Sequence, residues 1–312
     1  MINLVTTARI ETLWEHYRAL AARHPDALAE IALAEMPEAV HQSNAIENST
    51  LTLEDTERIV AGALPSASHD LREVFEASNL ARVTTDLLRS PEPLTSEVIL
   101  RWHRDLLTGI RDDAAGRFRR DGEWVRVGTH LGANPSFVTE LVEQSLARYR
   151  TGPPESALER IAWFHCEFEV IHPFVDGNGR IGRVLINHQL LRVGLPPVIV
   201  RARSRHAEYY PALDAYARTN RHDPMTRLLA LLVLEALHKR IALLTSREVI
   251  SLSEWARTAG IRANVAANKA KRQTIPAFRM RDRWMIAADY QAESGALNRV
   301  LRALDVVEGL HR

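Results

Sequence analysis

Apolar and polar residues alternate at helical spacing along most of this chain. Residues 8–35 follow the pattern, with His24-Pro25 as a break between two helices, and a third helix is expected over residues 36–49, beginning near Pro37. The same spacing recurs over residues 51–64, 69–90, 95–110, 137–150, 156–171, 183–194, 208–220 and 225–244. In the first of these, Thr52 and Asp55 have the spacing of a helix-capping arrangement. The pattern therefore predicts a mainly α-helical protein.

One segment of the first 240 residues departs from this pattern. Phe118, Trp124, Val125 and Val127 flank Asp121-Gly122, and apolar residues around an Asp-Gly pair are typical of a β-hairpin. A hairpin that only decorates a helical body is the alternative to a functional one.

The composition changes again from about Ser246. Between Ser253 and Arg283 there are eight Lys or Arg residues against two acids, and residues 279–286 have the pattern of a short hairpin. The sequence thus predicts three parts: N-terminal helices over residues 1–92, a helical core over residues 93–243, and a small domain over residues 246–312.

Composition and charge narrow the setting but not the function. The chain is 46% apolar with a net charge of +1, so global electrostatics select no partner. The single Cys166 fits a reducing compartment. The most apolar stretch, residues 228–244, is interrupted by Glu235 and by His238-Lys239-Arg240, so no membrane span and a cytoplasmic location are expected.

The chemistry is concentrated in residues 172–183, HPFVDGNGRIGR. Gly177, Asn178 and Gly179 precede a helical segment, where backbone N–H groups without helical partners and the helix dipole favour an anion such as phosphate. Arg180 and Arg183 are three residues apart and can face the same side of that helix. Two guanidinium groups beside an amide cradle suit a polyphosphate.

Two further side chains complete the predicted site. Asp176 would repel bound phosphates unless a cation bridges them, which implies Mg²⁺. His172 stands four residues earlier, where its imidazole could take a proton from an incoming hydroxyl. A plain turn would need only the Asn-Gly pair, so the set as a whole indicates phosphoryl or nucleotidyl transfer.

The twelve residues match every fixed position of the motif of the Fic family, His-x-Phe-x-(Asp/Glu)-Gly-Asn-Gly-Arg-x-x-Arg, and the resemblance covers about residues 37–240. Fic enzymes move AMP from ATP onto protein hydroxyls. The resemblance implies a Fic-type helical bundle in which His172 is the base and Asp176 holds Mg²⁺. It also implies that Gly177, Asn178 and Gly179 line the anion hole, and that Arg180 and Arg183 hold the β- and γ-phosphates of ATP.

The same resemblance implies a target-binding flap and a base pocket. Arg117 to Gly128 resembles the family's hairpin flap, with Val125, Arg126, Val127 and Gly128 as the edge along which a target protein would add a strand. Tyr209 and Tyr210 match aromatic positions that flank adenine. Relatives often carry Asn eight residues after the first Tyr, where this chain has Ala217, so transfer of UMP or GMP stays an alternative.

An inhibitory pattern lies upstream of the motif. Ser43, Glu47 and Asn48 fit the family's (Ser/Thr)-x-x-x-Glu-(Gly/Asn). The resemblance implies that Glu47 pairs with Arg183 and takes the guanidinium that would otherwise hold the γ-phosphate. A role of Glu47 in removing AMP from a modified target is the alternative.

The C-terminal part resembles an excisionase-like winged helix-turn-helix. In this interpretation Ser253 caps the first helix, Gly260 makes the turn, residues 264–272 form the recognition helix and residues 279–284 the wing. Such a domain binds DNA or docks on protein. The rival to an enzyme is therefore a nucleotide-sensing DNA-binding regulator. Self-modification and a homodimer are further partner options.

Overall fold

The computed structural model describes residues 4–66, 68–89, 92–128, 130–151 and 157–291. They form two compact units, one made of residues 30–229 and the other of the described parts of residues 1–29 and 230–312. Two helices, α2 (Pro25–Ile46) and α10 (Asp223–Thr245), contribute residues to both units. The three-part division expected from the sequence stays a prediction.

The unit of residues 30–229 is almost entirely helical. Its helices besides α2 and α10 are α3 (Leu53–Val60), α4 (Leu71–Arg89), α5 (Ser96–Leu107), α6 (Val138–Thr151), α7 (Ala157–Ile171), α8 (Asn178–Arg192) and α9 (Tyr210–Thr219), with short helical turns at Pro135–Phe137, Ala202–Ser204 and Arg205–Tyr209. The fully buried aromatic side chains of this unit include Trp102, Phe164, Phe168 and Phe174.

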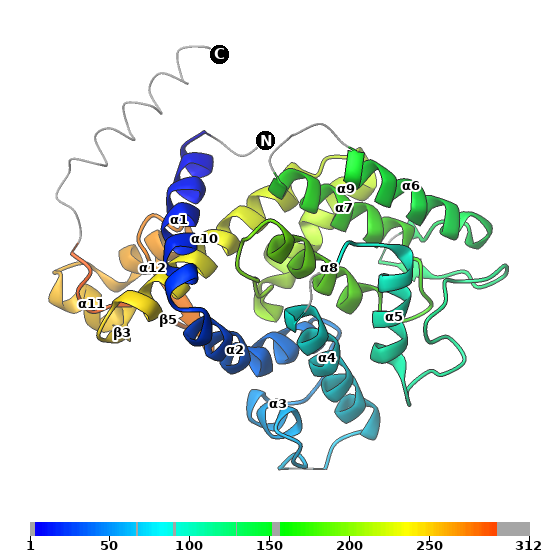
Figure 1. Cartoon of the computed structure of the whole chain (residues 1–312), viewed down its shortest axis with the longest axis horizontal. Helices are drawn as coiled ribbons and strands as arrows, with labels where there is room; N and C mark the ends of the chain where they lie inside the picture. The colour runs from blue at the N-terminus through cyan, green and yellow to red at the C-terminus, as the bar shows by residue number, and fades with distance from the viewer. Residues whose placement is uncertain (1–3, 67, 90–91, 129, 152–156, 292–312) are drawn as a thin grey trace. The chain divides into compact units, whose positions relative to one another are not determined.

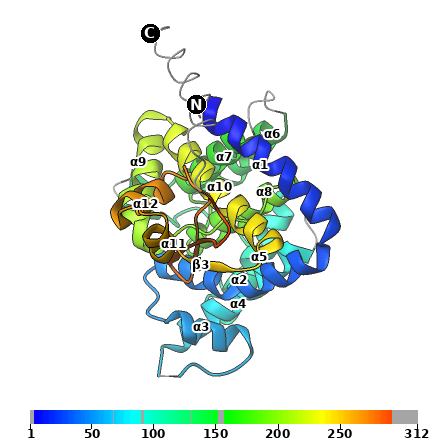
Figure 2. The ribbon, with the colours of Figure 1, turned by 90° about the vertical axis from the view of Figure 1, so that its left-hand side faces the viewer.

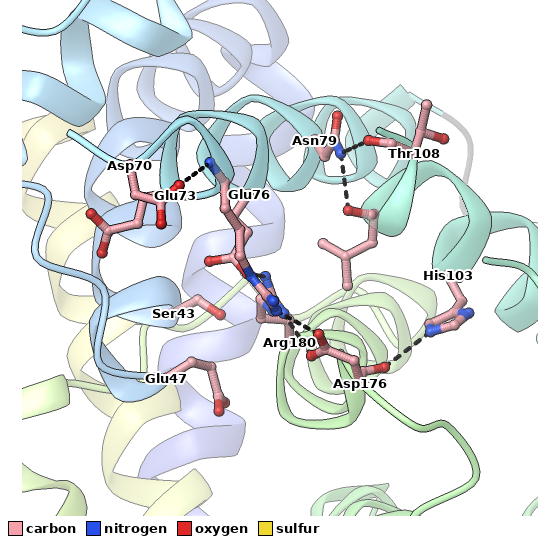
Figure 3. Close-up of polar contacts among 12 residues, drawn as sticks. Ser43, Glu47, Asp70, Glu73, Glu76, Asn79, His103, Thr108, Asp176 and Arg180 are labelled. Carbon is pink, nitrogen blue, oxygen red and sulfur yellow. Dashed lines mark hydrogen bonds and ion pairs between the residues drawn. The ribbon is translucent and has the colours of Figure 1, made fainter. Parts of the chain in front are cut away.

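Helix α8 is the centre of this unit. It packs against α7, α4 and α5, which surround it in Figure 1. Helix α4 is fixed beside α5 because the Asn79 amide donates to the carbonyl oxygens of Leu106 (3.0 Å) and Thr108 (2.8 Å). Figure 3 shows the bond between Asn79 and Thr108. This arrangement brings the beginning of α4 close to the beginning of α8.

The predicted capping of α3 is confirmed. Thr52 accepts from the Asp55 backbone N–H at 3.1 Å, and the Asp55 carboxylate accepts from the Thr52 backbone N–H, which makes a reciprocal capping box. Asp55 also accepts from Ser66, and these hydrogen bonds lower the pKa of its carboxyl well below the usual range. Helix α3 packs against α4, at the lower end of the chain in Figure 2.

The flap hairpin exists, but its predicted turn is wrong. Strand β1 (Arg126–Val127) pairs antiparallel with β2 (His130–Leu131), so the chain reverses after Val127 rather than at Asp121-Gly122. The Asp121-Gly122 turn is instead held by Glu123, which accepts from the Arg120 backbone N–H and pairs with Arg117 at 2.7 Å. The Arg117–Glu123 ion pair thus stabilises the Asp121-Gly122 turn, and the hairpin forms farther along the chain, between β1 and β2.

The second unit contains α1 (Leu4–Arg23) and a compact C-terminal group. Strand β3 (Val249–Ser251) is followed by α11 (Leu252–Thr258), α12 (Ala263–Lys271), β4 (Phe278–Met280) and β5 (Arg283–Ala287). The sheet order is β3-β5-β4, all antiparallel, and the predicted hairpin over residues 279–286 is confirmed. The apolar core of the group is formed by Leu252, Trp255, Ala256, Ala266, Ala270, Ile275, Ala277 and Ile286.

The mainly helical fold class with one hairpin flap is confirmed, while several helix boundaries differ from the prediction. Helix α2 does not begin near Pro37 but runs through it from Pro25, because burial of Met36, Val40 and Ile46 on the core outweighs the one missing N–H. The cap of α11 is Ser251 rather than Ser253. That the C-terminal group is a winged helix-turn-helix stays a prediction, and residues 292–312 lie outside the described part. None of the described helices is long and apolar enough to cross a bilayer.

Candidate active site at the start of helix α8

The first turn of α8 has the open backbone that an anion site requires. Gly177 is the N-cap with φ +82°, a left-handed conformation that favours glycine, and no side chain caps the helix. A Cβ atom on Gly179 would lie 2.3 Å from Glu47 Oε1 and 3.0 Å from an Arg183 nitrogen. Any larger residue would therefore displace the groups around the helix start.

The Asn178 side chain has a structural role that the motif does not state. It is buried, accepts from the Phe174 backbone N–H and donates to the Phe174 carbonyl oxygen, both at 2.8 Å. This pair of bonds closes the loop between His172 and Gly177. Asn178 thus lines the site through its backbone, while its side chain holds the loop in shape.

His172 directly follows α7 and lies at the edge of the site. Its Nδ1 is 3.2 Å from the Glu169 carbonyl oxygen, an acceptor that fixes the proton on Nδ1 and leaves Nε2 free to accept one. Burial lowers the pKa of His172 to about 4. The imidazole is therefore neutral at physiological pH, as a general base requires.

Asp176 is held by three groups. Its Oδ1 lies 3.1 Å from an Arg180 nitrogen and its Oδ2 lies 2.6 Å from Arg72 Nη2. Its backbone carbonyl accepts from His103 Nε2 at 3.0 Å, shown in Figure 3. His103 must carry its proton on Nε2, because its Nδ1 accepts from the Gly116 N–H at 3.1 Å. Burial lowers the pKa of His103 to about 4, in keeping with this neutral form.

The two motif arginines are paired with different acids. Arg180 is buried and contacts Glu76 on α4 at 3.0 Å in addition to Asp176. Arg183 is also buried and forms an ion pair with Glu47 at 2.8 Å. Burial alone would lower the pKa of Arg183, but the Glu47 carboxylate outweighs this and raises it above the usual value.

The segment around Glu47 is built to present this carboxylate. Ser43 binds the Arg183 guanidinium twice, through its hydroxyl and its carbonyl oxygen, both at 2.9 Å. Glu47 follows directly after the end of α2 instead of lying on the helix as expected, and Asn48 adopts φ +67°. Asparagine tolerates this left-handed position better than other residues with a side chain. The end of α2 thus binds Arg183 through Ser43 and Glu47, and the left-handed Asn48 forms the turn that follows.

Two adjoining cavities meet at this place and share Glu47, His172 and Gly179. One, of about 410 Å³, is lined by Arg72, Glu76, Asp176 and the first turn of α8. The other, of about 630 Å³, is lined by Arg183, Glu169, Tyr209, Tyr210 and the flap residues Arg126, Val127 and Gly128. Both have the size of small-molecule sites. Val125 is not among the lining residues, and its carbonyl oxygen accepts from the Gly132 N–H at 3.0 Å.

Comparison with known proteins identifies the segment that holds this motif. Residues 93–190 match the model of the Fic/DOC family. They form a Fic domain. The chain is 33% identical over 181 residues to a protein adenylyltransferase Fic of Nematostella vectensis and 32% identical over 219 residues to that of Drosophila melanogaster, alignments covering 56% and 67% of this chain. The chain spans less than half of these relatives, 42% and 44% of their lengths.

Solved structures of Fic proteins have the same fold. A Fic-domain signaling protein from Bacteroides thetaiotaomicron aligns with a TM-score of 0.67 at 21% identity, covering 76% of this chain and 97% of that one. Fic-1 from C. elegans (residues 134–508) aligns with a TM-score of 0.63 at 26% identity, covering 76% and 72%. A Fic family protein from Desulfovibrio desulfuricans has a TM-score of 0.67 at 21% identity and covers 94% and 98%.

The tyrosine pair lies beside the Fic domain motif but contributes unequally. Tyr209 is buried, and its hydroxyl lies 2.9 Å from His165 Nε2, so the ring lines the cavity while the hydroxyl is already bound. Burial raises the pKa of Tyr209 above its usual value. Tyr210 is partly exposed and donates to the Ile46 carbonyl oxygen at 3.1 Å. Ala217 is not among the residues that line this cavity.

Several residues of the site were not predicted from the sequence. They are Arg72 and Glu76 on α4, His103 on α5, Glu169 on α7, and Arg119 within the predicted flap segment, residues 117–128. Four of them lie far from residues 172–183 in the chain, whereas Glu169 lies three residues before His172, at a buried position of α7. No short-range signal in the sequence marks them.

Proposed function

We propose that this protein is a protein adenylyltransferase that transfers AMP from ATP to a Ser, Thr or Tyr hydroxyl of a protein. One observation carries the proposal: the glycine amides at the start of α8, the neutral His172, Asp176 and Arg183 all line two joined cavities large enough for a nucleotide. The names of the relatives, protein adenylyltransferase Fic, support the same chemistry.

The triphosphate of ATP fits the cavity beside the first turn of α8. Backbone N–H groups and the helix dipole would hold the phosphates there, while Arg180 and Arg183 supply positive charge. The base of the nucleotide would lie against Tyr209 and Tyr210 in the larger cavity. The target would add its backbone along Arg126 to Gly128, and its hydroxyl would then lie beside His172, which lines the same cavity.

The residues present fit a bound Mg²⁺. Among the described residues there is no group of three or more His, Cys, Asp or Glu side chains that could hold a metal by themselves. A single carboxylate, Asp176, together with substrate phosphates is an arrangement that Mg²⁺ commonly uses. The metal would neutralise charge on the phosphates and on the departing pyrophosphate.

The reaction is an in-line displacement at the α-phosphorus. His172 Nε2 accepts the proton of the target hydroxyl, the hydroxyl oxygen bonds to the α-phosphorus, and the bond from that phosphorus to the bridging oxygen breaks. Pyrophosphate leaves with that oxygen. Positioning of the groups and the fixed positive charges supply most of the rate.

We further propose that Glu47 inhibits this reaction. Its carboxylate occupies the Arg183 guanidinium at 2.8 Å and lies within 2.3 Å of where a Cβ on Gly179 would be, so it fills the space above the first turn of α8. A γ-phosphate needs the same guanidinium and the same space. Glu47 also lines both cavities, a position from which it could orient water for removal of AMP.

The deciding experiment is transfer of label from α-labelled ATP in the presence of Mg²⁺, with cell lysate and with the protein alone. Glu47→Gly should give labelled protein in lysate, labelled chain, or both, and Glu47→Gly combined with His172→Ala should give none. Unlabelled UTP and GTP as competitors test the base preference. Label transfer that survives the loss of His172 would contradict the assigned base, and the absence of label in every arm would contradict the activity.

A DNA-binding function is a second candidate, supported by one surface. Helix α12 and the residue after it expose Asn264, Asn268, Lys269, Lys271 and Arg272 to solvent. Amide and basic side chains on one short helix suit base edges and phosphates. Gel shifts at low and moderate salt, with Lys269→Ala/Lys271→Ala as the comparison, test it. Tight binding that weakens with salt, without AMP transfer, would favour a nucleotide-sensing regulator.

A further inference from the structure

A buried arginine connects the flap segment to the backbone of the catalytic histidine. Arg119 lies between α5 and β1 and is only 3% exposed. All of its guanidinium hydrogen bonds go to backbone carbonyl oxygens. Nε donates to His172 (2.8 Å), Nη1 donates to Glu123 (2.8 Å), and Nη2 donates to Ala133 (2.7 Å) and Ile171 (3.1 Å).

The backbone of the same residue strengthens this connection. The Arg119 N–H donates to the Pro173 carbonyl oxygen at 2.9 Å, so the peptides on both sides of His172 are bound to one residue. Ala133, which follows the hairpin, donates to the Ile171 carbonyl oxygen at 3.1 Å. The two arms of the flap and the end of α7 are therefore joined around a single guanidinium.

His172 needs such support because its backbone is unusual. It adopts φ +51°, a left-handed conformation that a residue with a side chain adopts only when its surroundings enforce it. The space around it is also filled: a Cβ on Gly132 would lie 3.2 Å from both the Arg119 Nη2 and the His172 Cβ. The planar guanidinium of an arginine can donate to several carbonyl oxygens in fixed directions, whereas the ammonium group of a lysine cannot reproduce this set of bonds.

The charge of Arg119 acts on the imidazole as well. The groups that influence His172 are Glu169, whose carbonyl faces Nδ1, and the charges of Arg119, Glu47 and His130. After burial, which is the largest cause, Arg119 is one of the groups that lower the pKa of His172. Removing this positive charge should raise that pKa.

We propose that Arg119 is the positioning residue of the catalytic base, which holds His172 in the conformation that faces the target hydroxyl and couples that conformation to the flap. This inference rests on the proposed adenylyl transfer, but the guanidinium contacts do not. Arg119 lies within the predicted flap segment, residues 117–128, and its sequence context suggests no role for it.

The test compares Arg119→Met and Arg119→Lys in the Glu47→Gly protein. Arg111→Met serves as the matched control, because Arg111 is exposed and pairs with the nearby Asp113. Turnover number, ATP affinity, thermal stability and the pKa of His172 are measured, the last by NMR of protein labelled at histidine nitrogen and assigned with His172→Ala. Misplacement of a reacting group by about 1 Å lowers rate about 100-fold, which is the loss expected for both Arg119 variants.

The expected results separate position from charge. Both variants should lose turnover while ATP affinity changes by less than about threefold, since none of the phosphate-binding groups is altered. Arg119→Met should also raise the pKa of His172, whereas Arg119→Lys should leave it close to the parent value. The control should change none of these.

A folded Arg119→Lys or Arg119→Met protein with turnover within about twofold of the parent would overturn the proposal. So would equal losses in turnover and ATP affinity, because they would indicate general disruption. If Arg119→Met does not fold, the lysine variant decides alone. If the parent shows no AMP transfer, the proposed function fails, and an unchanged His172 pKa in Arg119→Met would then separately reject the role of Arg119.

Discussion

Replacement of Glu47 by glycine should raise AMP transfer, and the size of the increase follows from the contacts of Arg183. Arg183 is 7% exposed and Glu47 39% exposed, so the pair is neither fully buried nor fully solvated. Two unit charges 2.8 Å apart attract by about 1.5 kcal/mol in water and about 6 kcal/mol at an effective dielectric constant of about 20. Because solvent reaches Glu47, we take the range of charge-assisted hydrogen bonds, about 1.5–3 kcal/mol.

This range corresponds to an increase of about 10- to 150-fold in the population whose Arg183 is free for the γ-phosphate. The remaining bonds of Arg183 matter for this estimate. Ser43 should keep both of its hydrogen bonds to the guanidinium in the variant. Arg183 should therefore stay in position, and the side of the guanidinium that Glu47 occupied should become free for the γ-phosphate. The gain should therefore appear as turnover.

The assay is the initial rate of label transfer from α-labelled ATP at saturating Mg²⁺, for wild type, Glu47→Gly, Glu47→Gln and the control Glu54→Gln. Glu47→Gln keeps the shape of the side chain but loses its charge, so it should give an intermediate rate. Glu54 is an exposed residue of α3, so its substitution should have no effect. Equal rates for wild type and both Glu47 variants would refute the competition between Glu47 and the γ-phosphate.

Three further predictions follow from the site. Titration of His172 should leave the transfer rate of Glu47→Gly unchanged from about pH 6 to 8 and lower it as the pH drops through about 4. Burial lowers the pKa of His172 to about 4, and protonation removes the base. A pH–rate profile that falls already between pH 7 and 6 would contradict this. Arg72→Ala should lower the Mg²⁺ concentration needed for half-maximal ATP binding, measured by calorimetry. The Arg72 guanidinium lies 2.6 Å from Asp176 Oδ2 and would compete with the cation for this oxygen. An unchanged or higher Mg²⁺ requirement would count against this competition. Asn48→Val should unfold at a lower temperature than Asn48→Gly and transfer AMP faster than wild type. The reason is that a β-branched residue strains the φ of +67° in the turn that holds Glu47. Equal melting temperatures for the two variants would speak against strain at this turn.

Helical periodicity predicts most of the helices, and the twelve-residue motif predicts the residues at the start of α8 that line the two cavities. The break at His24-Pro25 and the capping box at Thr52 are local features, set by residues within one turn of each other, and both are present as expected. The hairpin turn was misplaced because Asp121-Gly122 has the stronger turn chemistry. The Arg117–Glu123 ion pair, which the local pattern did not reveal, uses that turn as a brace.

The supporting residues could not be found in this way, because their roles depend on which helices become neighbours. Arg72 and Glu76 look like an ordinary exposed pair one helical turn apart until α4 is placed beside the start of α8, where both face Asp176 and Arg180. The position of α4 depends in turn on Asn79, which binds the carbonyl oxygens at the end of α5.

The arrangement of charges at the start of α8 is consistent with the proposed activity and with its proposed inhibition by Glu47. Each anionic or cationic group that the proposed reaction uses is already paired: Asp176 with Arg72 and Arg180, and Arg183 with Glu47. MgATP brings opposite charges that can replace these partners one for one, so binding would exchange ion pairs without leaving a buried charge alone. In the proposed inhibition Glu47 differs from the other partners because it comes from the turn directly after α2, where the left-handed Asn48 follows it. Residues 43–48 hold both Ser43 and Glu47 against Arg183, and we therefore expect control of the proposed activity to act on this segment.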